Sequence, residues 1–418
     1  MQKSEKTIYV YENWLEQEPH LIGKLHSSFA RATETFCFEY DDEWLRRSEA
    51  SCSLDPDLAL YGGRQYTPLD KKMFGLFEDS CPDRWGRTLL KRKEAIDARN
   101  EGRKPRKLTE SDLLLGVYDE ARMGALRFSL EEDGPFLSDD KSMATPPWVN
   151  LRTLESASLA FEKDDGGMEE KWLRQLLAPG SSLGGARPKA TVQAPDGSLW
   201  IAKFPSKHDD YNAGAWEKVV HDLARQCGLN VPESKLETFS KTGSTFLVKR
   251  FDRQGKRRIH FASAMTLLGK TDGEGSDGTS YLDLASFIRS NGSNPKADLL
   301  ELWKRIVFNM AVSNTDDHLR NHGFILAPDG WRLSPLYDVN PVPEGDMLSL
   351  NVNEDDGTID FSLAVEVAEY FGVSDRKANE TMKEMSQIIK TQWMPLAKQY
   401  GLGRGDIERM RPAFSLDL

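Results

Sequence analysis

Short apolar runs separated by polar, turn-rich segments are frequent in the first 255 residues. Runs of this kind predict β-strands. They fall at residues 7–11, 21–25, 34–40, 127–130, 234–238 and 245–250, and residues 191–206 predict a strand, an Asp-Gly hairpin turn and a second strand. Helical periodicity occurs between them at residues 83–99, 109–119, 149–161, 168–177 and 215–228. This part of the chain therefore mixes strands and helices.

From residue 260 onward the spacing of apolar positions is mainly helical. We expect helices at residues 261–268, 281–290, 296–313, 360–371, 374–399 and 404–410. In the long segment 296–313, Leu299, Leu302 and Ile306 recur on one side, as they do in a helix with one buried face. An apolar strand at 323–327 and a turn at 328–330 interrupt the helices and predict a hairpin.

Composition indicates a globular chain without membrane or disulfide features. The 418 residues suffice for two or three domains. No apolar run approaches the ~20 residues of a membrane helix, and the first residues lack the apolar core of a signal peptide. We therefore expect a cytoplasmic protein that does not enter a membrane. The four cysteines show no C-x-x-C spacing and are expected to be reduced thiols: Cys37, Cys52, Cys81 and Cys227.

The net charge of −11 argues against nucleic-acid binding by the chain as a whole. A local basic cluster nevertheless runs from Arg84 to Lys107 and could contact DNA phosphates. Because Glu94, Asp97 and Glu101 interrupt it, we favour a solvated helix face followed by a basic loop. Contact with DNA inside a larger complex stays the alternative.

The strongest chemical signal lies in residues 311–340, AVSNTDDHLRNHGFILAPDGWRLSPLYDVN. Asp316 is followed five residues later by Asn321, and Asp338 comes after the predicted hairpin. Phosphoryl transfer uses such a set in this order: one carboxylate orients the attacking hydroxyl, while an Asn and a second Asp hold magnesium on the phosphates. Asp and Asn are also common in ordinary turns. The hairpin between the two halves of this set favours the catalytic interpretation.

Two neighbouring features have alternative interpretations. Asp317 competes with Asp316 as the base, but only Asp316 has the five-residue step to Asn321. His318 and His322 lie four residues apart, as zinc ligands on a helix do. The zinc motif H-E-x-x-H needs Glu after the first His, and here Leu319 follows. We therefore expect His318 to brace the loop by hydrogen bonds.

Residues 180–190, GSSLGGARPKA, predict a loop that could hold phosphates. Gly184 and Gly185 allow the backbone to approach a phosphate, and successive N–H groups can bind it. No Gly-Lys-Ser/Thr ends the loop, so it is not a Walker A sequence, and an ordinary glycine-rich turn is equally common. Lys203 favours phosphate binding, because it lies on the strand after the hairpin, as the phosphate-pairing lysine of kinases does.

Glu217 allows two interpretations of equal weight. It could form the Lys–Glu ion pair that kinases require, or it could be an acid in the first turn of a helix, favoured there by the helix dipole. The strand at 245–250 leads into V-K-R-F-D at 248–252, where the hinge of a kinase offers backbone groups to adenine.

Five ordered motifs together resemble one known family. They are S-S-L-G-G-A-R-P-K, W-I-A-K-F-P, V-K-R-F-D-R, N-T-D-D-H-L-R-N and L-S-P-L-Y-D-V. The chain resembles the HipA-type serine/threonine kinase toxins of bacterial type II toxin–antitoxin systems. The segments F-E-Y-D-D-E-W-L at 38–45 and D-S-C-P-D-R-W-G-R at 79–87 resemble the first subdomain of that family, so the resemblance spans nearly the whole chain.

The resemblance implies a role for each matching residue. Asp316 is the implied catalytic base, and Asn321 and Asp338 are the implied ligands of Mg²⁺. Ser182 is the implied autophosphorylation site, whose phosphate ejects the loop and inactivates the kinase. The implied contacts to ATP are made by Ser182, Gly184, Gly185, Ala186, Lys189, Lys203, Lys249, Phe251 and His318.

The resemblance also implies an architecture and partners. We expect an α+β, two-lobed protein-kinase-like fold: residues 1–147 as an extra N-terminal subdomain, 148–255 as a small ATP-binding lobe, and 256–418 as an all-helical C-terminal lobe. The boundary near 147 follows from a polar segment at 131–147, rich in Pro, Gly and Asp. The implied partners are a helix-turn-helix antitoxin, DNA mainly through that antitoxin, and a protein substrate of the aminoacyl-tRNA synthetase class.

Two other functions remain open at the level of the sequence. D-x-H-x-x-N also occurs in kinases of lipids and antibiotics, so a small-molecule kinase is possible. The chain could also be a non-catalytic co-repressor that holds a DNA-binding antitoxin. Autophosphorylation at Ser182 would favour the toxin, and relief of growth arrest by a catalytically inactive variant would exclude the co-repressor as the sole role.

Overall fold

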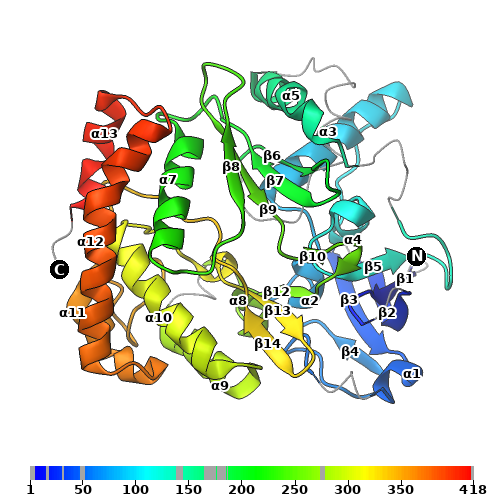
Figure 1. Cartoon of the computed structure of the whole chain (residues 1–418). Coiled ribbons are helices and arrows are strands. Elements are labelled where there is room, and N and C mark those ends of the chain that lie inside the picture. Colours follow the sequence, from blue (N-terminus) through cyan, green and yellow to red (C-terminus); the bar gives the residue numbers. More distant parts are fainter. Residues whose placement is uncertain are drawn as a thin grey trace. The chain divides into compact units, whose positions relative to one another are not determined.

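The computed structural model divides the chain into two compact units. Unit 1 contains Met1–Lys207 and Arg250–Ala262, and unit 2 contains His208–Lys249 and Ser263–Leu418. The structure describes residues 5–15, 18–30, 33–47, 52–137, 145–163, 176, 185, 187–273 and 278–415. Figure 1 shows the helices and strands of both units.

Unit 1 contains a five-stranded sheet in the order β4-β3-β2-β1-β5, with all neighbours antiparallel. The strands are β1 (Glu5–Glu12), β2 (His20–Ala30), β3 (Thr33–Tyr40), β4 (Arg64–Tyr66) and β5 (Leu126–Ser129). Ile8, Leu25 and Phe38 are direct neighbours across three strands, and all are fully buried. Such a row of apolar side chains on one face fixes the register of the strands.

The helices of unit 1 are short apart from two, and local side chains set their ends. They are α1 (Asp42–Leu45), α2 (Gly75–Glu78), α3 (Arg84–Asn100), α4 (Glu110–Leu115) and α5 (Leu151–Lys163), with 3₁₀ turns η2 (Asp119–Ala121) and η4 (Trp148–Asn150). Asp83 caps α3 by accepting a hydrogen bond from the amide of Gly86. Thr109 and Asp112 form a capping box at α4, which ends earlier than the predicted residue 119.

Unit 1 also contains two hairpins. The strands β6 (Lys189–Gln193) and β7 (Leu199–Lys203) pair antiparallel across the predicted Asp-Gly turn, where Gly197 has a φ of +84°. The strands β10 (Arg253–Gln254) and β11 (Arg257–Arg258) form a smaller hairpin, followed by β12 (Phe261–Ser263).

Unit 2 begins with α7 (Ala213–Gln226) and the antiparallel pair β8 (Ser234–Glu237) and β9 (Thr245–Lys249). The remaining elements are α8 (Ala264–Leu267), α9 (Tyr281–Asn291), α10 (Pro295–Ala311), η6 (Leu319–Asn321), β13 (Gly323–Ala327), β14 (Gly330–Leu333), α11 (Phe361–Glu366), η7 (Ala368–Phe371), α12 (Asp375–Gln399), α13 (Arg404–Met410) and η8 (Arg411–Phe414). The long helix α12 lies alongside α7 (Figure 1), and Trp393 stacks on Phe414 at 4.8 Å between ring centroids.

Three sequence expectations about unit 2 need correction. The helix expected at 261–268 begins as a strand, because the Ser263 side chain caps α8 and helix starts only at Ala264. The helix expected at 360–371 is broken into α11 and η7 around Val367. The C-terminal part is not all-helical, since β13 and β14 pair across the turn that ends at Gly330.

Other expectations are confirmed or lie outside the described residues. All four cysteines are free thiols. Among the described residues, no helix combines the length and the apolar character needed to cross a membrane. The helix expected at 168–177 falls outside the described residues except for residue 176. The predicted boundaries at 147/148 and 255/256 do not coincide with those of the two units, and the division into three domains stays a prediction.

Candidate active site

The end of helix α10 places the loop that carries the predicted catalytic residues. After the helix, Ser313 adopts a left-handed conformation with a φ of +52°, which is uncommon outside glycine. The amide of Asn314 donates a hydrogen bond to the carbonyl of Asn309 (2.8 Å), which closes the turn. The next residues, 315–318, therefore leave the helix axis, with Asp316 exposed and Asp317 buried.

Asp317 anchors this turn from inside unit 2. Its buried carboxylate accepts hydrogen bonds from Nδ2 of Asn309 (2.7 Å), from Nε2 of His322 (2.7 Å) and from the hydroxyl of Tyr281. Burial opposes its negative charge, but His322 and Tyr281 outweigh that cost and lower the pKa of Asp317 below its usual value. Asp317 is thus a fixed anion inside the protein, and it is not available to a substrate.

Asp316 faces solvent, in contrast to its neighbour. Partial loss of hydration raises the pKa of its carboxyl group above the usual value; His318 opposes this rise, and the nearby carboxylate of Asp338 adds to it. The backbone carbonyl of Asp316 accepts hydrogen bonds from the amide of His318 (3.1 Å) and from Nδ2 of Asn321 (2.8 Å). The two predicted residues, Asp316 and Asn321, are therefore joined directly.

Asp338 occupies a strained backbone position. Its φ of +57° lies in the left-handed region, where a residue other than glycine carries a cost of about 1–3 kcal/mol. A chain of amide hydrogen bonds holds the segment: Nδ2 of Asn340 donates to Oδ1 of Asp338 (3.3 Å), and the amide of Asn340 donates to Oδ1 of Asn314 (3.2 Å). Strain of this kind is typical of functional sites, where the surroundings enforce a side-chain direction.

The oxygen atoms of Asn321 and Asp338 fit a magnesium ion. Magnesium prefers oxygen ligands and usually takes one or two carboxylates from the protein, with phosphates and water completing its shell. Because Nδ2 of Asn321 is committed to the carbonyl of Asp316, Oδ1 is the atom left for a cation. Within the described residues, no group of three or more His, Cys, Asp and Glu side chains could hold a metal by itself.

The expected brace by His318 is only partly correct. Its backbone amide and carbonyl hold the loop through Asp316 and Asn321. Among the described residues, however, no hydrogen-bond partner reaches its buried Nδ1 atom. The histidine that braces the loop with its side chain is His322, through Asp317. The same five-residue step that joins Asp316 to Asn321 also joins Asp317 to His322, and this repeated step in the sequence could have revealed the second pair.

The residues expected to bind phosphate lie in unit 1. Lys203 ends β7, directly opposite Lys189 on β6. Gly185 has a φ of +92°, and a Cβ atom added there would lie 2.9 Å from Nζ of Lys189. Lys189 is buried and forms an ion pair with Asp83 at 3.0 Å, a partnership that sequence reasoning missed. Ser182, Gly184 and Ala186 lie outside the described residues.

The expected hinge residues occupy different surroundings. The amide of Lys249 donates to the carbonyl of Glu233 (2.8 Å), and contact of the Lys249 and Phe251 backbone with adenine stays a prediction. The ring of Phe251 lies 6.0 Å from that of Phe261. Glu217 is buried on α7 in unit 2, whereas Lys203 belongs to unit 1, and an ion pair between them stays a prediction.

The basic cluster of residues 84–107 is partly neutralised within unit 1. Arg87 pairs with Glu110, Lys93 with Asp97, and both Arg103 and Arg106 with Glu94. These pairs support the interpretation as a solvated helix face and loop, and contact with DNA stays a prediction.

Comparison with known proteins identifies the family. The model of the HipA-like C-terminal domain matches residues 181–393, and the model of the HipA N-terminal domain matches residues 14–129. The chain belongs to the HipA family. The first match contains Asp316, Asn321 and Asp338, and the second contains β2, β3, β4 and β5 of the five-stranded sheet, while β1 lies before it.

Individual HipA relatives and related kinases support this assignment over different lengths. The serine/threonine-protein kinase toxin HipA of Shewanella oneidensis is 26% identical over 351 residues, 76% of this chain and 72% of that protein. The provisionally named kinase Y4mE of Sinorhizobium fredii is 29% identical over 182 residues, 38% of this chain. The chain matches only 41% of the length of Y4mE, and 42% of a similarly named Haemophilus influenzae protein.

A solved HipA-family structure shares the fold. The Shewanella oneidensis MR-1 chain, from a structure of the toxin–antitoxin system HipA, HipB and operator DNA, matches with a TM-score of 0.64 at 18% identity. The match covers 97% of this chain and 95% of that chain. This chain therefore shares its fold with the solved HipA chain over nearly the full length of both.

Proposed function

We propose that this chain is an ATP-dependent serine/threonine protein kinase and the toxin of a toxin–antitoxin pair, with a two-lobed kinase-like organisation. The observation that carries the proposal is the connected set in unit 2: Asn321 bonded to the carbonyl of Asp316, with Asp338 held in a strained conformation. A base and two oxygen ligands for a cation, supplied in this order, match the requirements of phosphoryl transfer.

Each residue of the set has a separate task. Asp316 orients the attacking hydroxyl and accepts its proton, and a raised pKa makes it a better base than a free aspartate. Asn321 and Asp338 would hold Mg²⁺, which neutralises charge on the phosphates of ATP. Asp317 keeps the loop in place through Asn309, His322 and Tyr281. Lys203 and the loop at 180–190 would bind the phosphates.

The partners follow from the relatives. The solved Shewanella structure contains HipA, HipB and operator DNA, and the match to this chain is nearly complete. We therefore infer that this chain binds a helix-turn-helix antitoxin and reaches DNA mainly through it. A protein substrate of the aminoacyl-tRNA synthetase class follows from the family resemblance.

Autophosphorylation of Ser182 is the proposed means of regulation. A phosphate there would add roughly −1.5 to −2 charges beside a site for anions. Gly184 and Gly185 make a second loop conformation accessible at low cost. Phosphorylation should therefore expel the loop and abolish ATP binding, as an order–disorder switch does.

Label transfer from ATP tests the proposal. Purified wild-type protein is incubated with ATP labelled on the γ-phosphate, with magnesium or with a chelator, and the modified residue is located by mass spectrometry. We expect protein-bound label at Ser182 that requires magnesium and is absent in Asp316→Asn. Labelling that is equal with and without magnesium would contradict the kinase, and label found only on a lipid or antibiotic added to the reaction would favour a small-molecule kinase.

A further inference from the structure

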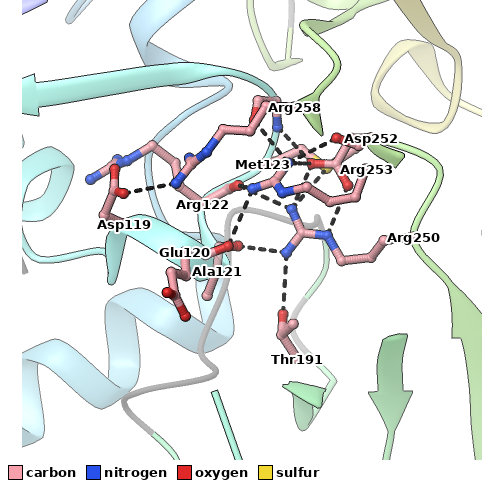
Figure 2. Close-up of polar contacts among 11 residues, drawn as sticks. Asp119, Glu120, Ala121, Arg122, Met123, Thr191, Arg250, Asp252, Arg253 and Arg258 are labelled. Atoms are coloured by element: carbon pink, nitrogen blue, oxygen red, sulfur yellow. Dashed lines mark hydrogen bonds and ion pairs between the residues drawn. The ribbon is translucent and has the colours of Figure 1, made fainter. Parts of the chain in front are cut away.

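A buried cluster in unit 1 surrounds the segment that follows the proposed adenine contact (Figure 2). The side chain of Arg250 is fully buried, and so is that of Asp252. A guanidinium group has five N–H donors. In Arg250 these donors reach Asp252 (Nε–Oδ1 2.8 Å, Nη2–Oδ2 2.6 Å), the carbonyls of Ala121 (2.7 Å) and Arg122 (3.0 Å), and Oγ1 of Thr191 (3.4 Å).

Asp252, the ion-pair partner of Arg250, binds further donors in this cluster. Its carboxylate also accepts hydrogen bonds from the amide of Gly124 (2.8 Å) and from Arg253 (2.6 Å). Burial disfavours its charge, but the guanidinium groups of Arg250 and Arg253 outweigh burial and lower the pKa of Asp252 to about 2. Arg253 in turn donates to the carbonyls of Glu120, Arg122 and Gly124. The carbonyls of the turn at 120–124 thus accept hydrogen bonds from the guanidinium groups of both Arg250 and Arg253.

Arg250 connects the segments on which the proposed nucleotide residues of unit 1 lie, through its side chain and through its backbone amide. Thr191 is on β6, two residues after Lys189. The backbone amide of Arg250 donates to the carbonyl of Leu199 (2.9 Å) on β7, the strand that ends at Lys203. Phe251 lies between Arg250 and Asp252 in the sequence. Loss of the Arg250 side-chain contacts would release β6 at Thr191 and the backbone beside the Arg250–Asp252 pair, and β7 would be affected through its pairing with β6.

Stability alone does not require this arrangement. Well-packed apolar residues of similar volume often stabilise a fold as much as a buried ion pair does, or more. Buried charges with fixed geometry, in contrast, can specify one arrangement of the backbone. The cluster contacts β6 and lies in the proposed hinge segment at 248–252. A single fixed backbone arrangement there would keep the proposed nucleotide-binding residues in place.

We propose that Arg250, with Asp252 and the carbonyls of Ala121 and Arg122, positions the nucleotide-binding segments of unit 1. The inference rests on the proposed kinase function and deepens it. Arg250 is a positioning residue that acts through Lys189, Lys203 and the backbone at Phe251. It follows that the turn at 120–124, in the expected N-terminal subdomain, contributes to ATP binding without touching ATP.

The test separates ATP binding from chemistry in the full-length protein. Arg250→Lys keeps the charge but removes the forked contacts. We expect the KM for ATP to rise about tenfold, the equivalent of one or two hydrogen bonds, with kcat nearly unchanged, because Asp316, Asn321 and Asp338 lie in unit 2. Arg257→Lys is the matched control, since Arg257 is in the same segment but its side chain, among the described residues, donates to the carbonyl of Trp14 alone.

A second pair of variants covers the case in which Arg250→Lys does not fold. Thr191→Val removes one hydroxyl at nearly constant volume, and Thr191→Ser restores it. We expect Thr191→Val to raise the KM for ATP by about threefold, the equivalent of a weak hydrogen bond, and Thr191→Ser to bind as the wild type does.

Three outcomes are informative. An unchanged KM for ATP in a folded Arg250→Lys, or equal changes in Arg250→Lys and Arg257→Lys, overturns the inference while wild-type activity leaves the proposed function standing. Equal KM values for ATP in Thr191→Val and Thr191→Ser also overturn the inference and leave the proposed function standing. If wild-type protein neither binds ATP nor transfers its phosphate, the proposed function fails, and this inference fails with it.

Discussion

Two adjacent carboxylates show how surroundings decide the task of a residue. Asp316 and Asp317 are identical in the sequence, yet one faces solvent with a raised pKa and the other is buried with a lowered pKa. The difference arises from the donors around them: Asn309, His322 and Tyr281 all point at Asp317. Sequence spacing predicts Asp316 as the base, and that choice stays a prediction. The spacing did not predict the three donors to Asp317, because they come from α9, α10 and the residue that follows η6.

Replacing Asp317 by Asn should destabilise unit 2. Removing one charge from a buried pair typically costs about 3–5 kcal/mol, because the partner remains desolvated. We expect a loss near the lower end, since Asn still accepts one hydrogen bond. The free energy of unfolding is measured in urea. The control Asp329→Asn, in the exposed turn between β13 and β14, should change it by less than about 0.5 kcal/mol. Equal stability of both variants would refute the structural role of Asp317.

The same residue predicts how stability depends on pH. The pKa of Asp317 is lowered in the folded state, so its stabilising contribution is complete above the unfolded value of about 3.9 and is lost as the pH falls toward the folded value. Wild-type stability should therefore fall below about pH 4, and the gap between wild type and Asp317→Asn should narrow there. A constant gap between pH 3 and pH 7, roughly either side of that pKa, would contradict this assignment.

Asn321→Ala and Asp338→Ala should lose magnesium-dependent ATP binding more than they lose stability. Each removes one oxygen ligand of the proposed ion. Asp338→Ala also leaves alanine in a left-handed conformation, so its stability should fall by about 1 kcal/mol. Calorimetry with ATP, with and without magnesium, measures the effect. Asp329→Asn serves again as the control, and unchanged affinity for magnesium–ATP in both alanine variants would eliminate the assigned ligands.

At the scale of elements, a second loop supports the catalytic turn. The amide of Val342 donates to the carbonyl of Ser313 (3.0 Å), and both the amide and the hydroxyl of Ser349 donate to the carbonyl of Thr315 (3.1 and 2.7 Å). The sequence predicted α10 and the hairpin β13–β14 because periodicity and turn residues are local signals. It did not predict this support, since hydrogen bonds between irregular segments leave no periodic pattern.

Gly345 lies against Thr315 of the catalytic turn. A Cβ atom there would lie 2.2 Å from Cγ2 and 3.1 Å from Cβ of Thr315, the residue before Asp316. Gly345→Ala should therefore displace the catalytic turn and lower kcat by at least about tenfold, since small displacements of positioned groups have large effects on rate. Gly405→Ala, with no atom near the added Cβ, is the control.

A compensating change checks the cause. Thr315→Ala removes Cγ2 and Oγ1 and leaves a contact that a small shift can accommodate. The double variant Gly345→Ala with Thr315→Ala should recover most of the lost kcat. If the double variant is as slow as Gly345→Ala alone, the loss has another origin.

At the scale of the whole molecule, the sequence predicted the family, whereas its division of the chain into three domains stays a prediction. The polar segment 131–147 resembles a linker, and composition supports a boundary there. The structure places Arg250–Ala262 in the same unit as the N-terminal sheet, and Arg250 makes buried contacts with the carbonyls of Ala121 and Arg122. Contacts between segments more than a hundred residues apart cannot be read from local composition.

A fragment that starts at residue 148 tests this organisation. It lacks the carbonyls of Ala121 and Arg122 and the carboxylate of Asp119, so Arg250, Arg253 and Arg258 would lose their buried partners. Unpaired buried charges cost several kcal/mol each, and the fragment should be insoluble or unfold without cooperativity. Calorimetry compares the thermal unfolding of the fragment with that of the full-length protein. A fragment that unfolds at the Tm of the full-length protein would show that residues 148–418 fold alone.

The rate of phosphoryl transfer by Asp316→Asn tests the central claim most directly. Transfer from γ-labelled ATP is measured at saturating magnesium for the wild type, Asp316→Asn and the control Asp329→Asn, after equal unfolding curves confirm that all three are folded. Loss of a general base should lower the rate by at least about 10²-fold, while stability stays the same or rises slightly, because the raised pKa shows that the folded protein disfavours the charge of Asp316. Asp316→Asn that transfers phosphate at the wild-type rate would contradict the assignment of this loop.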